Sequence, residues 1–189
     1  MQLEPEGTDP DQNRTTPGWM LDEMMHAGPE HLDANYVAAY DEMSRTDFEE
    51  VVDRLIGLGL GHESTVVDIG GGTGSFAIAA ALVAGRVIAI DVSPAMVQLM
   101  RNRISALGIK NVEVVHAGVL SYQHAGDPPD FVHSRHTLHQ IPDFWKVISL
   151  QKIHDLLRTG GILHPRDLFF SFTPDATEQV IGSGCGMHR

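Results

Sequence analysis

The sequence predicts an α/β fold, a doubly wound parallel sheet of about five strands with flanking helices. Short apolar runs rich in β-branched residues alternate with longer helical segments between about residues 59 and 172. Such alternation implies right-handed crossovers and parallel strands. Two of the runs end in an aspartate, Asp68 and Asp91, and a glycine-rich turn follows the first of them. Ligands of open parallel sheets bind at this carboxyl edge.

Composition limits the classes of protein that the chain can belong to. Its 189 residues, 42% of them hydrophobic, support one domain with a sizeable core. Lysine and arginine number 13 against 25 acidic residues, a net charge of −12 that argues against a nucleic-acid substrate. The single Cys185 excludes an internal disulfide, and the longest strongly apolar run, 76–85, is too short to cross a bilayer. We therefore expect a cytoplasmic protein with no nucleic-acid or membrane partner; its oligomeric state is not predicted.

The N-terminal region divides into a tail and several helices. Residues 1–16 are polar and we expect them to be disordered. We expect helices within residues 17–58, two short ones over 19–25 and 29–40 and a third running to about residue 58. Thr46 and Glu49 have the spacing of a capping box at the start of this third helix.

The first strand leads into a turn built for close approach of a ligand. After Asp68, glycines stand at every second position, Gly70, Gly72 and Gly74, and a helix is expected from near Thr73 through the apolar run. Glycine permits positive φ and removes the Cβ that would stand in a ligand's way. A helix start also offers unpaired N–H groups.

Two kinds of ligand fit such a turn, and the side chains around it favour one. In the dinucleotide pattern G-x-G-x-x-G the third glycine would fall on Ser75. Asp68 would repel a pyrophosphate and suits a cationic group better. S-adenosylmethionine carries an ammonium and a sulfonium and no phosphate. A glycine-rich turn of some other α/β protein is the remaining alternative.

The second strand, 86–91, supports the same ligand. Asp91 lies 21 residues after Gly70, where an acid at the tip of the next parallel strand can accept hydrogen bonds from a ribose diol. Ser93 has the character of an N-cap and Pro94 of a first helical residue, and the helix should end at Leu107 before Gly108. Alternatively, Asp91 is simply a carboxylate near that helix start.

Three further segments follow in order. A strand is expected over 112–118, another from 130 to about Ser134, and the segment 156–163 has the Leu-Arg-x-Gly-Gly turn into a fifth strand. Together with the Asp-x-Gly-x-Gly-x-Gly turn, these segments resemble the motifs of class I S-adenosylmethionine-dependent methyltransferases. The resemblance covers about residues 60 to 172. The segments 139–143 and 158–161 are similar to the small-molecule branch that includes quinone-biosynthesis methyltransferases.

The resemblance implies a Rossmann-like domain over 59–172, S-adenosylmethionine as cofactor, and a set of binding residues. Asp68 and the turn would hold the methionine part, with Ser134 near it, and Asp91 the ribose. Many relatives have an acid after the glycine that ends the third strand, where this chain has Val119. N-terminal helices can form a lid, to which Tyr40 could belong; an ordinary packed aromatic is equally compatible. The expected cofactor-binding residues are Asp68, Gly70, Gly72, Gly74, Asp91, Val92, Met96, Gly118, Val119, Ser134 and Tyr40.

Histidines provide candidates for other chemistry. His133, His136 and His139 recur at intervals of three, which on one helix could form a metal site. Because His133 falls in the expected fourth strand, we predict no metal site. His139 could be a general base near the transferred methyl or a histidine of the loop wall. No catalytic residue is assigned.

The C-terminal region is short for this kind of sheet. The fifth strand is expected over about 162–172, and residues 173–189 show no strand or helix periodicity. We expect a chain truncated before the usual antiparallel hairpin, which would leave the fifth strand at an edge, where Pro165 is tolerated.

The expected function is transfer of a methyl group from S-adenosylmethionine to a small-molecule acceptor. A weakly active or inactive cofactor-binding fragment is the alternative. A nicotinamide-dependent oxidoreductase on a similar sheet is disfavoured by Asp68 and Ser75.

Overall fold

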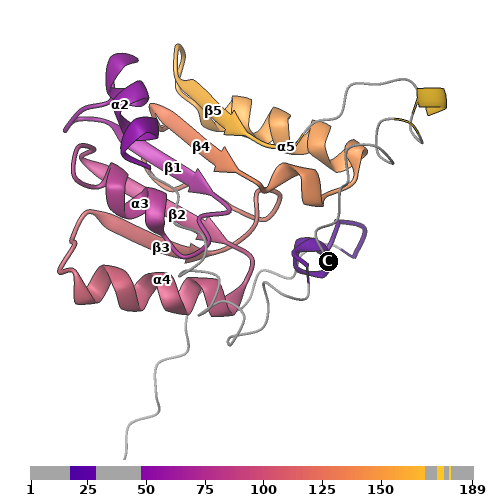
Figure 1. Cartoon of the computed structure of the whole chain (residues 1–189), viewed down its shortest axis with the longest axis horizontal. Helices are drawn as coiled ribbons and strands as arrows, with labels where there is room; N and C mark the ends of the chain where they lie inside the picture. Colours follow the sequence, from indigo (N-terminus) through magenta and orange to yellow (C-terminus); the bar gives the residue numbers. More distant parts are fainter. Residues whose placement is uncertain (1–17, 29–47, 169–173, 177–178, 180–189) are drawn as a thin grey trace, which may run out of the picture.

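The computed structural model describes residues 18–28, 48–168, 174–176 and 179, and its centre is a five-stranded, all-parallel sheet (Figure 1). The strand order is β3-β2-β1-β4-β5. The predicted α/β fold class is therefore confirmed. The strands are β1 (Thr65–Ile69), β2 (Arg86–Asp91), β3 (Val112–His116), β4 (Phe131–Arg135) and β5 (Ile162–Arg166).

The strand order reverses beside β1, and this reversal positions the site. The chain passes from β1 outward to β2 and β3, then returns to β4 on the other side of β1. In register, Ile69 at the tip of β1 pairs with Ile90 on one side and Ser134 on the other. The loops after β1 and β4 diverge from this point, which opens a crevice at the carboxyl edge.

Helices cover both faces of the sheet. They are α2 (Glu49–Gly57), α3 (Ser75–Ala80), α4 (Pro94–Ala106) and α5 (Asp143–Leu156), with short 3-10 helices η1 (Glu23–His26), η3 (Leu138–Gln140) and η4 (Pro174–Ala176). One apolar cluster joins α2, α3 and α4 to one face, and a second joins η3 and α5 to the other. The two faces alternate along each strand: Val66 belongs to the first cluster and Val67 to the second.

The sequence predicted α4 closely. The Ser93 hydroxyl accepts a hydrogen bond from the Met96 amide, and Pro94 is the first helical residue. Gly108, two residues after the helix, takes a positive φ of 68°. These are the expected start and stop signals of the helix.

The helix predicted over the apolar run is shorter than expected. It begins at Ser75 because Gly74 takes a left-handed conformation, φ 84°, as its N-cap. It ends at Ala80, because the Asn111 side-chain amide donates to the carbonyls of Ala81 and Ala84 and draws the chain into a turn. The structure thus corrects the expectation of a helix reaching residue 85.

Other boundaries also differ from the prediction. β3 ends at His116, two residues before Gly118. β5 ends at Arg166, and the Asp167 carboxylate after it accepts a hydrogen bond from the Leu168 amide. α2 starts at Glu49 after Phe48, so Glu49 is not the third residue of a helix capped at 46. Thr46, the helix expected over 29–40, the polar tail 1–16 and most of residues 169–189 lie outside the described residues. The truncation therefore stays a prediction.

The N-terminal segment 18–28 packs beside α5. Where a helix was expected over 19–25, only η1 forms. Trp19 and Trp145 stack with ring centroids 6.4 Å apart, and Met20 and Leu21 join the second apolar cluster. Among the described helices, none is both long and apolar enough to cross a membrane.

Candidate functional site

A cavity of about 370 Å³ opens at the carboxyl edge of the sheet, where the loops after β1, β2, β3 and β4 converge. The segment after β5 and the N-terminal segment also reach it. Of the predicted cofactor-binding residues, these line the cavity: Asp68, Gly70, Gly72, Asp91, Val92, Met96, Gly118 and Val119.

The glycine turn after β1 has left-handed backbone at each of its alternating glycines. Gly70 and Gly72 have φ values of 71° and 55°. A Cβ at Gly70 would lie 2.0 Å from the Thr137 hydroxyl oxygen, whereas a Cβ at Gly72 would meet nothing within 4 Å. Gly72 therefore leaves open cavity space that a side chain would fill, as a ligand cradle requires.

Asp68 is a buried carboxylate whose Oδ2 atom has no hydrogen-bond partner among the described residues. Burial, and secondarily the charge of Asp91, raise its pKa to about 8. A carboxylate in this position is costly unless a cation pairs with it. The site thus fits the ammonium and sulfonium charges of S-adenosylmethionine and disfavours a pyrophosphate.

Asp91 ties the tip of β2 to the glycine turn. Its Oδ2 accepts a hydrogen bond from the Gly72 amide at 2.9 Å, and its Oδ1 accepts one from the Ser93 amide at 2.8 Å. Each carboxylate oxygen can accept a further hydrogen bond. Asp91 can therefore receive a ribose hydroxyl while it fixes the turn.

An acid reaches the third loop from the N-terminal segment. Glu23 Oε1 accepts a hydrogen bond from the Leu120 amide, and Oε2 accepts from the amide and hydroxyl of Ser121. Its carboxyl group lies so close to Gly118 that a Cβ there would be 2.3 Å from it. Glu23 thus places a carboxylate at the loop where Val119 stands instead of an acid. No sequence signal linked Glu23 to a loop 97 residues away.

Three predicted residues are not among those lining the cavity. Gly74 packs on Met100, where a Cβ would lie 2.5 Å from its Cγ. Ser134 is 1% exposed within β4, and its hydroxyl has no partner among the described residues. Tyr40 lies outside the described residues.

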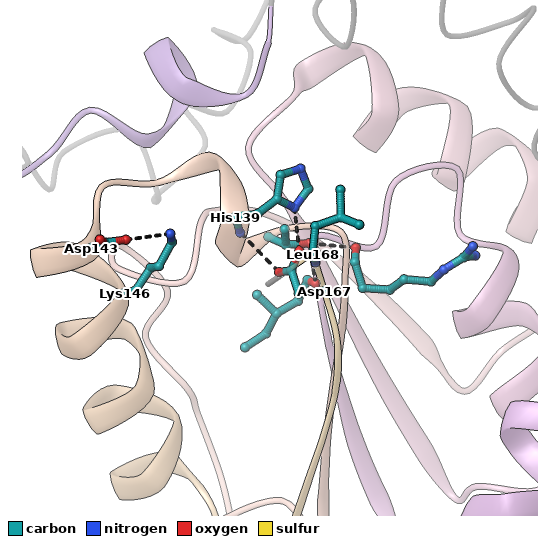
Figure 2. A network of polar contacts seen from close by, with 8 residues as sticks. His139, Asp143, Lys146, Asp167 and Leu168 are labelled. Carbon is teal, nitrogen blue, oxygen red and sulfur yellow. Dashed lines mark hydrogen bonds and ion pairs between the residues drawn. The ribbon is translucent and has the colours of Figure 1, made fainter. Parts of the chain in front are cut away.

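A second wall of the cavity, beside the glycine turn, is formed by the end of β4 and the chain after it. Arg135, His136 and His139 line it, and His136 takes a positive φ of 51°, which is uncommon for a non-glycine residue. Figure 2 shows His139 above Asp167, with hydrogen bonds between the two. Asp167 lies just past the end of β5, and sequence reasoning missed it because no motif marks that position.

The three spaced histidines do not share one helix, as expected. His133 lies in β4, where its ring stacks on that of Phe76 with the ring centroids 3.8 Å apart. Its Nδ1 lies 3.1 Å from His164 Nδ1. Burial, together with the neighbouring His164, lowers the pKa of His133 to about 3. His133 is therefore a neutral ring at physiological pH.

A different trio meets the spacing of metal ligands. One ligand atom each from His136, His139 and Asp167 lie within 4.8 Å of one another. The sequence predicted no metal site, and Asp167 was not among its candidate residues. The trio is therefore apparent only from the structure.

Comparisons with known proteins agree with this geometry. A family model described as a methyltransferase domain matches residues 66–161. The chain is similar to the YcgJ protein of Bacillus subtilis (22% identity, TM-score 0.62), covering 71% of this chain but only 57% of that one. A SAM-dependent methyltransferase from Aquifex aeolicus shares 22% identity with a TM-score of 0.60, over 81% and 88% of the two chains.

A third similar structure is an rRNA methylase from Streptococcus thermophilus, 27% identical with a TM-score of 0.54, over 74% of this chain and 81% of that one. The search of curated proteins gave no match. At these identities, the first two structures establish the fold.

Proposed function

The chain belongs to the methyltransferase domain family, with the class I fold and S-adenosylmethionine as cofactor, and we propose that it methylates a small-molecule acceptor. The observation that carries the proposal is the pair of strand-tip carboxylates in one cavity. Asp68 is buried with an unpartnered oxygen, and Asp91 is bonded to the glycine turn. This pair favours a cationic cofactor over a nicotinamide dinucleotide.

We assign the cofactor's parts to residues as follows. Asp68, Gly70 and Gly72 hold the amino-acid end, and Asp91 holds the ribose. Val92, Met96 and Val119 supply apolar contact for the adenine, beside Gly118 and the Glu23 carboxylate. When bound, the cofactor supplies an electrophilic methyl group. The residues of this chain then need to hold a nucleophile in line with it and exclude water, and such orientation supplies much of the rate.

The acceptor is proposed to be small because one cavity of about 370 Å³ contains both the cofactor residues and the wall after β4. The excess of acidic residues, 25 against 13 basic, opposes a polyanionic acceptor. An RNA acceptor, as for the S. thermophilus neighbour, would need a basic patch near the cavity. Arg135 lines the wall and suits an acceptor with a negative or developing negative charge. The similarity to quinone-biosynthesis enzymes stays a prediction.

Calorimetry with S-adenosylmethionine, S-adenosylhomocysteine and NADH tests the cofactor, and a screen with methyl-labelled cofactor then tests the acceptor. We expect micromolar binding of the two adenosyl ligands and none of NADH. Asp68→Asn should weaken binding, whereas Glu63→Gln, a change at a side chain 91% exposed, should not. Binding of NADH with no binding of S-adenosylhomocysteine would overturn the proposal. Methyl transfer to RNA and to no small molecule would overturn its acceptor class.

A further inference from the structure

His139 and Asp167 form a closely bonded pair at the wall of the cavity, and none of the proposed cofactor contacts uses either residue. His139 Nδ1 lies 2.5 Å from Asp167 Oδ1, and the His139 backbone amide donates to Asp167 Oδ2 at 3.1 Å. His139 is thus bound to the Asp167 carboxylate through both its ring and its backbone amide (Figure 2). The Asp167 side chain is 1% exposed and that of His139 is 30% exposed.

The ionisation of Asp167 and the ring tautomer of His139 follow from these contacts. Burial on its own would raise the pKa of Asp167, but hydrogen bonds from Leu168 and His139 outweigh it and lower the pKa. Asp167 is therefore an ionised acceptor. A neutral His139 ring facing it must carry its proton on Nδ1, which leaves the lone pair on Nε2.

We propose that His139 is the general base of the reaction, held by Asp167 as its positioning residue, and that the acceptor is a hydroxyl compound, an alcohol or a phenol. This inference rests on the proposed function. An O–CH3 bond forms while the S–CH3 bond breaks and its electron pair stays on sulfur. The hydroxyl proton passes to His139 Nε2. A hydroxyl needs this help because its neutral oxygen is a weak nucleophile.

A metal ion at His136, His139 and Asp167 is the competing use of the same residues. The Asp167 oxygens already accept hydrogen bonds from Leu168 N, His139 N and His139 Nδ1. Burial lowers the pKa of His136, and the charges of Arg135 and Arg166 also lower it, whereas the charge of Asp167 raises it. A dication would displace the hydrogen bonds and face the positive charge of the two arginines, so the base is favoured.

The chain contains a matched control pair on the surface. His154 Nδ1 lies 3.1 Å from Asp155 Oδ1 on α5, with side chains 82% and 65% exposed. The same substitutions there change the same atoms away from the cavity.

The first test needs no acceptor. Nitrogen-15 NMR of the full chain at pH 8, with the His139 ring assigned by comparison with His139→Gln, reports which ring nitrogen carries the proton. We expect protonated Nδ1 in the wild type, and a mixture with protonated Nε2 in Asp167→Asn but not in Asp155→Asn. A wild-type ring protonated mainly on Nε2 would overturn the proposal.

The second test separates a base from a structural role. Methyl transfer is measured to the phenols catechol and 4-hydroxybenzoate and to benzenethiol, which is already ionised at pH 8. His139→Gln should slow transfer to whichever phenol the wild type methylates by about 10²- to 10⁴-fold. It should slow transfer to benzenethiol by less than about tenfold. Binding of S-adenosylhomocysteine, measured by calorimetry, should stay intact. His154→Gln should change none of these.

Other results of the methyl-transfer test would each contradict a different part of the proposal. Equal losses with phenol and thiol would overturn the base. Intact cofactor binding with transfer to benzenethiol but to neither phenol would overturn the hydroxyl acceptor. Activity removed by EDTA, restored by Zn²⁺ and lost equally in His136→Gln would replace the base by a metal site. Absence of cofactor binding would instead refute the proposed function, and the NMR result would still decide the pairing.

Discussion

The Asp91 carboxylate accepts a hydrogen bond from the Gly72 amide at 2.9 Å, so the second strand-tip acid holds the glycine turn that follows the first. The two parts of the site that the sequence places 19 residues apart are therefore one hydrogen-bonded unit. Changes at either residue should affect cofactor binding through the other.

Asp91→Ala should weaken S-adenosylhomocysteine binding by roughly 10- to 150-fold, because it removes a charged acceptor worth about 1.5–3 kcal/mol. Calorimetry of the variant measures the loss, with Glu63→Ala as the exposed control. Wild-type affinity in Asp91→Ala would remove this residue from the site.

Gly72→Ala and Gly70→Ala should differ in kind. At Gly72 the new Cβ enters open cavity space, so binding should be lost while the free energy of unfolding falls by about 1–2 kcal/mol for the left-handed backbone. At Gly70 the Cβ also meets Thr137, so unfolding should become easier by about 1–3 kcal/mol more. Urea titration beside calorimetry separates the effects; native binding in Gly72→Ala would contradict the cradle.

Cofactor binding should release a proton near pH 7. The pKa of Asp68 is raised to about 8, so the carboxyl is mostly protonated at pH 7, and a bound ammonium favours its ionised form. Binding heats measured in buffers of different ionisation enthalpy should give a release approaching one proton. Asp68→Asn should abolish this release; a wild type with no buffer dependence would show that Asp68 does not meet the cation.

Glu23→Ala should weaken S-adenosylhomocysteine binding about 5- to 10-fold by removing a carboxylate beside the loop after β3, where we propose that the adenine binds. The analogue S-inosylhomocysteine carries an oxo group in place of the adenine amino group and should lose less affinity. Calorimetry with both ligands checks this difference. Equal losses would mean that Glu23 acts only by supporting the loop through Leu120 and Ser121.

His133 should destabilise the fold in acid. Its pKa is lowered from 6.5 to about 3, so below pH 6.5 the unfolded chain takes up a proton that the folded chain refuses. Stability is therefore lost as pH falls from 6.5 toward 3, by roughly 2 kcal/mol between pH 6.5 and 5. The raised pKa of Asp68 acts oppositely, since its contribution is present below pH 3.8 and lost as pH rises to about 8.

The difference in free energy of unfolding between a His133 variant and the wild type removes the opposing contribution of Asp68, which is present in both. The free energy of unfolding of His133→Leu, relative to the wild type, should rise by about 2 kcal/mol from pH 6.5 to 5. Denaturant titrations at both pH values measure it, with the exposed His154→Leu as control. A pH-independent difference would mean that His133 ionises normally in the fold.

Local signals predicted what local sequence determines. The strand tips at Asp68 and Asp91, the glycine turn, and the cap of α4 at Ser93 each depend on a few consecutive residues, and the structure has them. The turn after α3 depends on the Asn111 side chain, 30 residues from Ala81, so the predicted helix was too long.

The missed site residues have the same origin. Asp167 meets His139 across 28 residues, and Glu23 meets Leu120 across 97. Neither contact has a fixed spacing or periodicity, because it arises only when strand order brings loop ends together. Sequence reasoning therefore predicted cavity-lining residues in the glycine turn and after β2 and β3, and left the wall after β4 largely unassigned.

The stacked pair Trp19–Trp145 is an intrinsic fluorescence probe of the N-terminal segment. The sequence contains 2 tryptophans, so all of its indole fluorescence comes from the junction between the N-terminal segment and α5. Trp19 is already 73% exposed, whereas Trp145 is partly buried, so the emission of Trp145 should shift to the red if the segment leaves that helix. Because Glu23 in the same segment accepts a hydrogen bond from Leu120 in the loop after β3, a stopped-flow trace of unlabelled protein would time the movement of this segment against cofactor arrival.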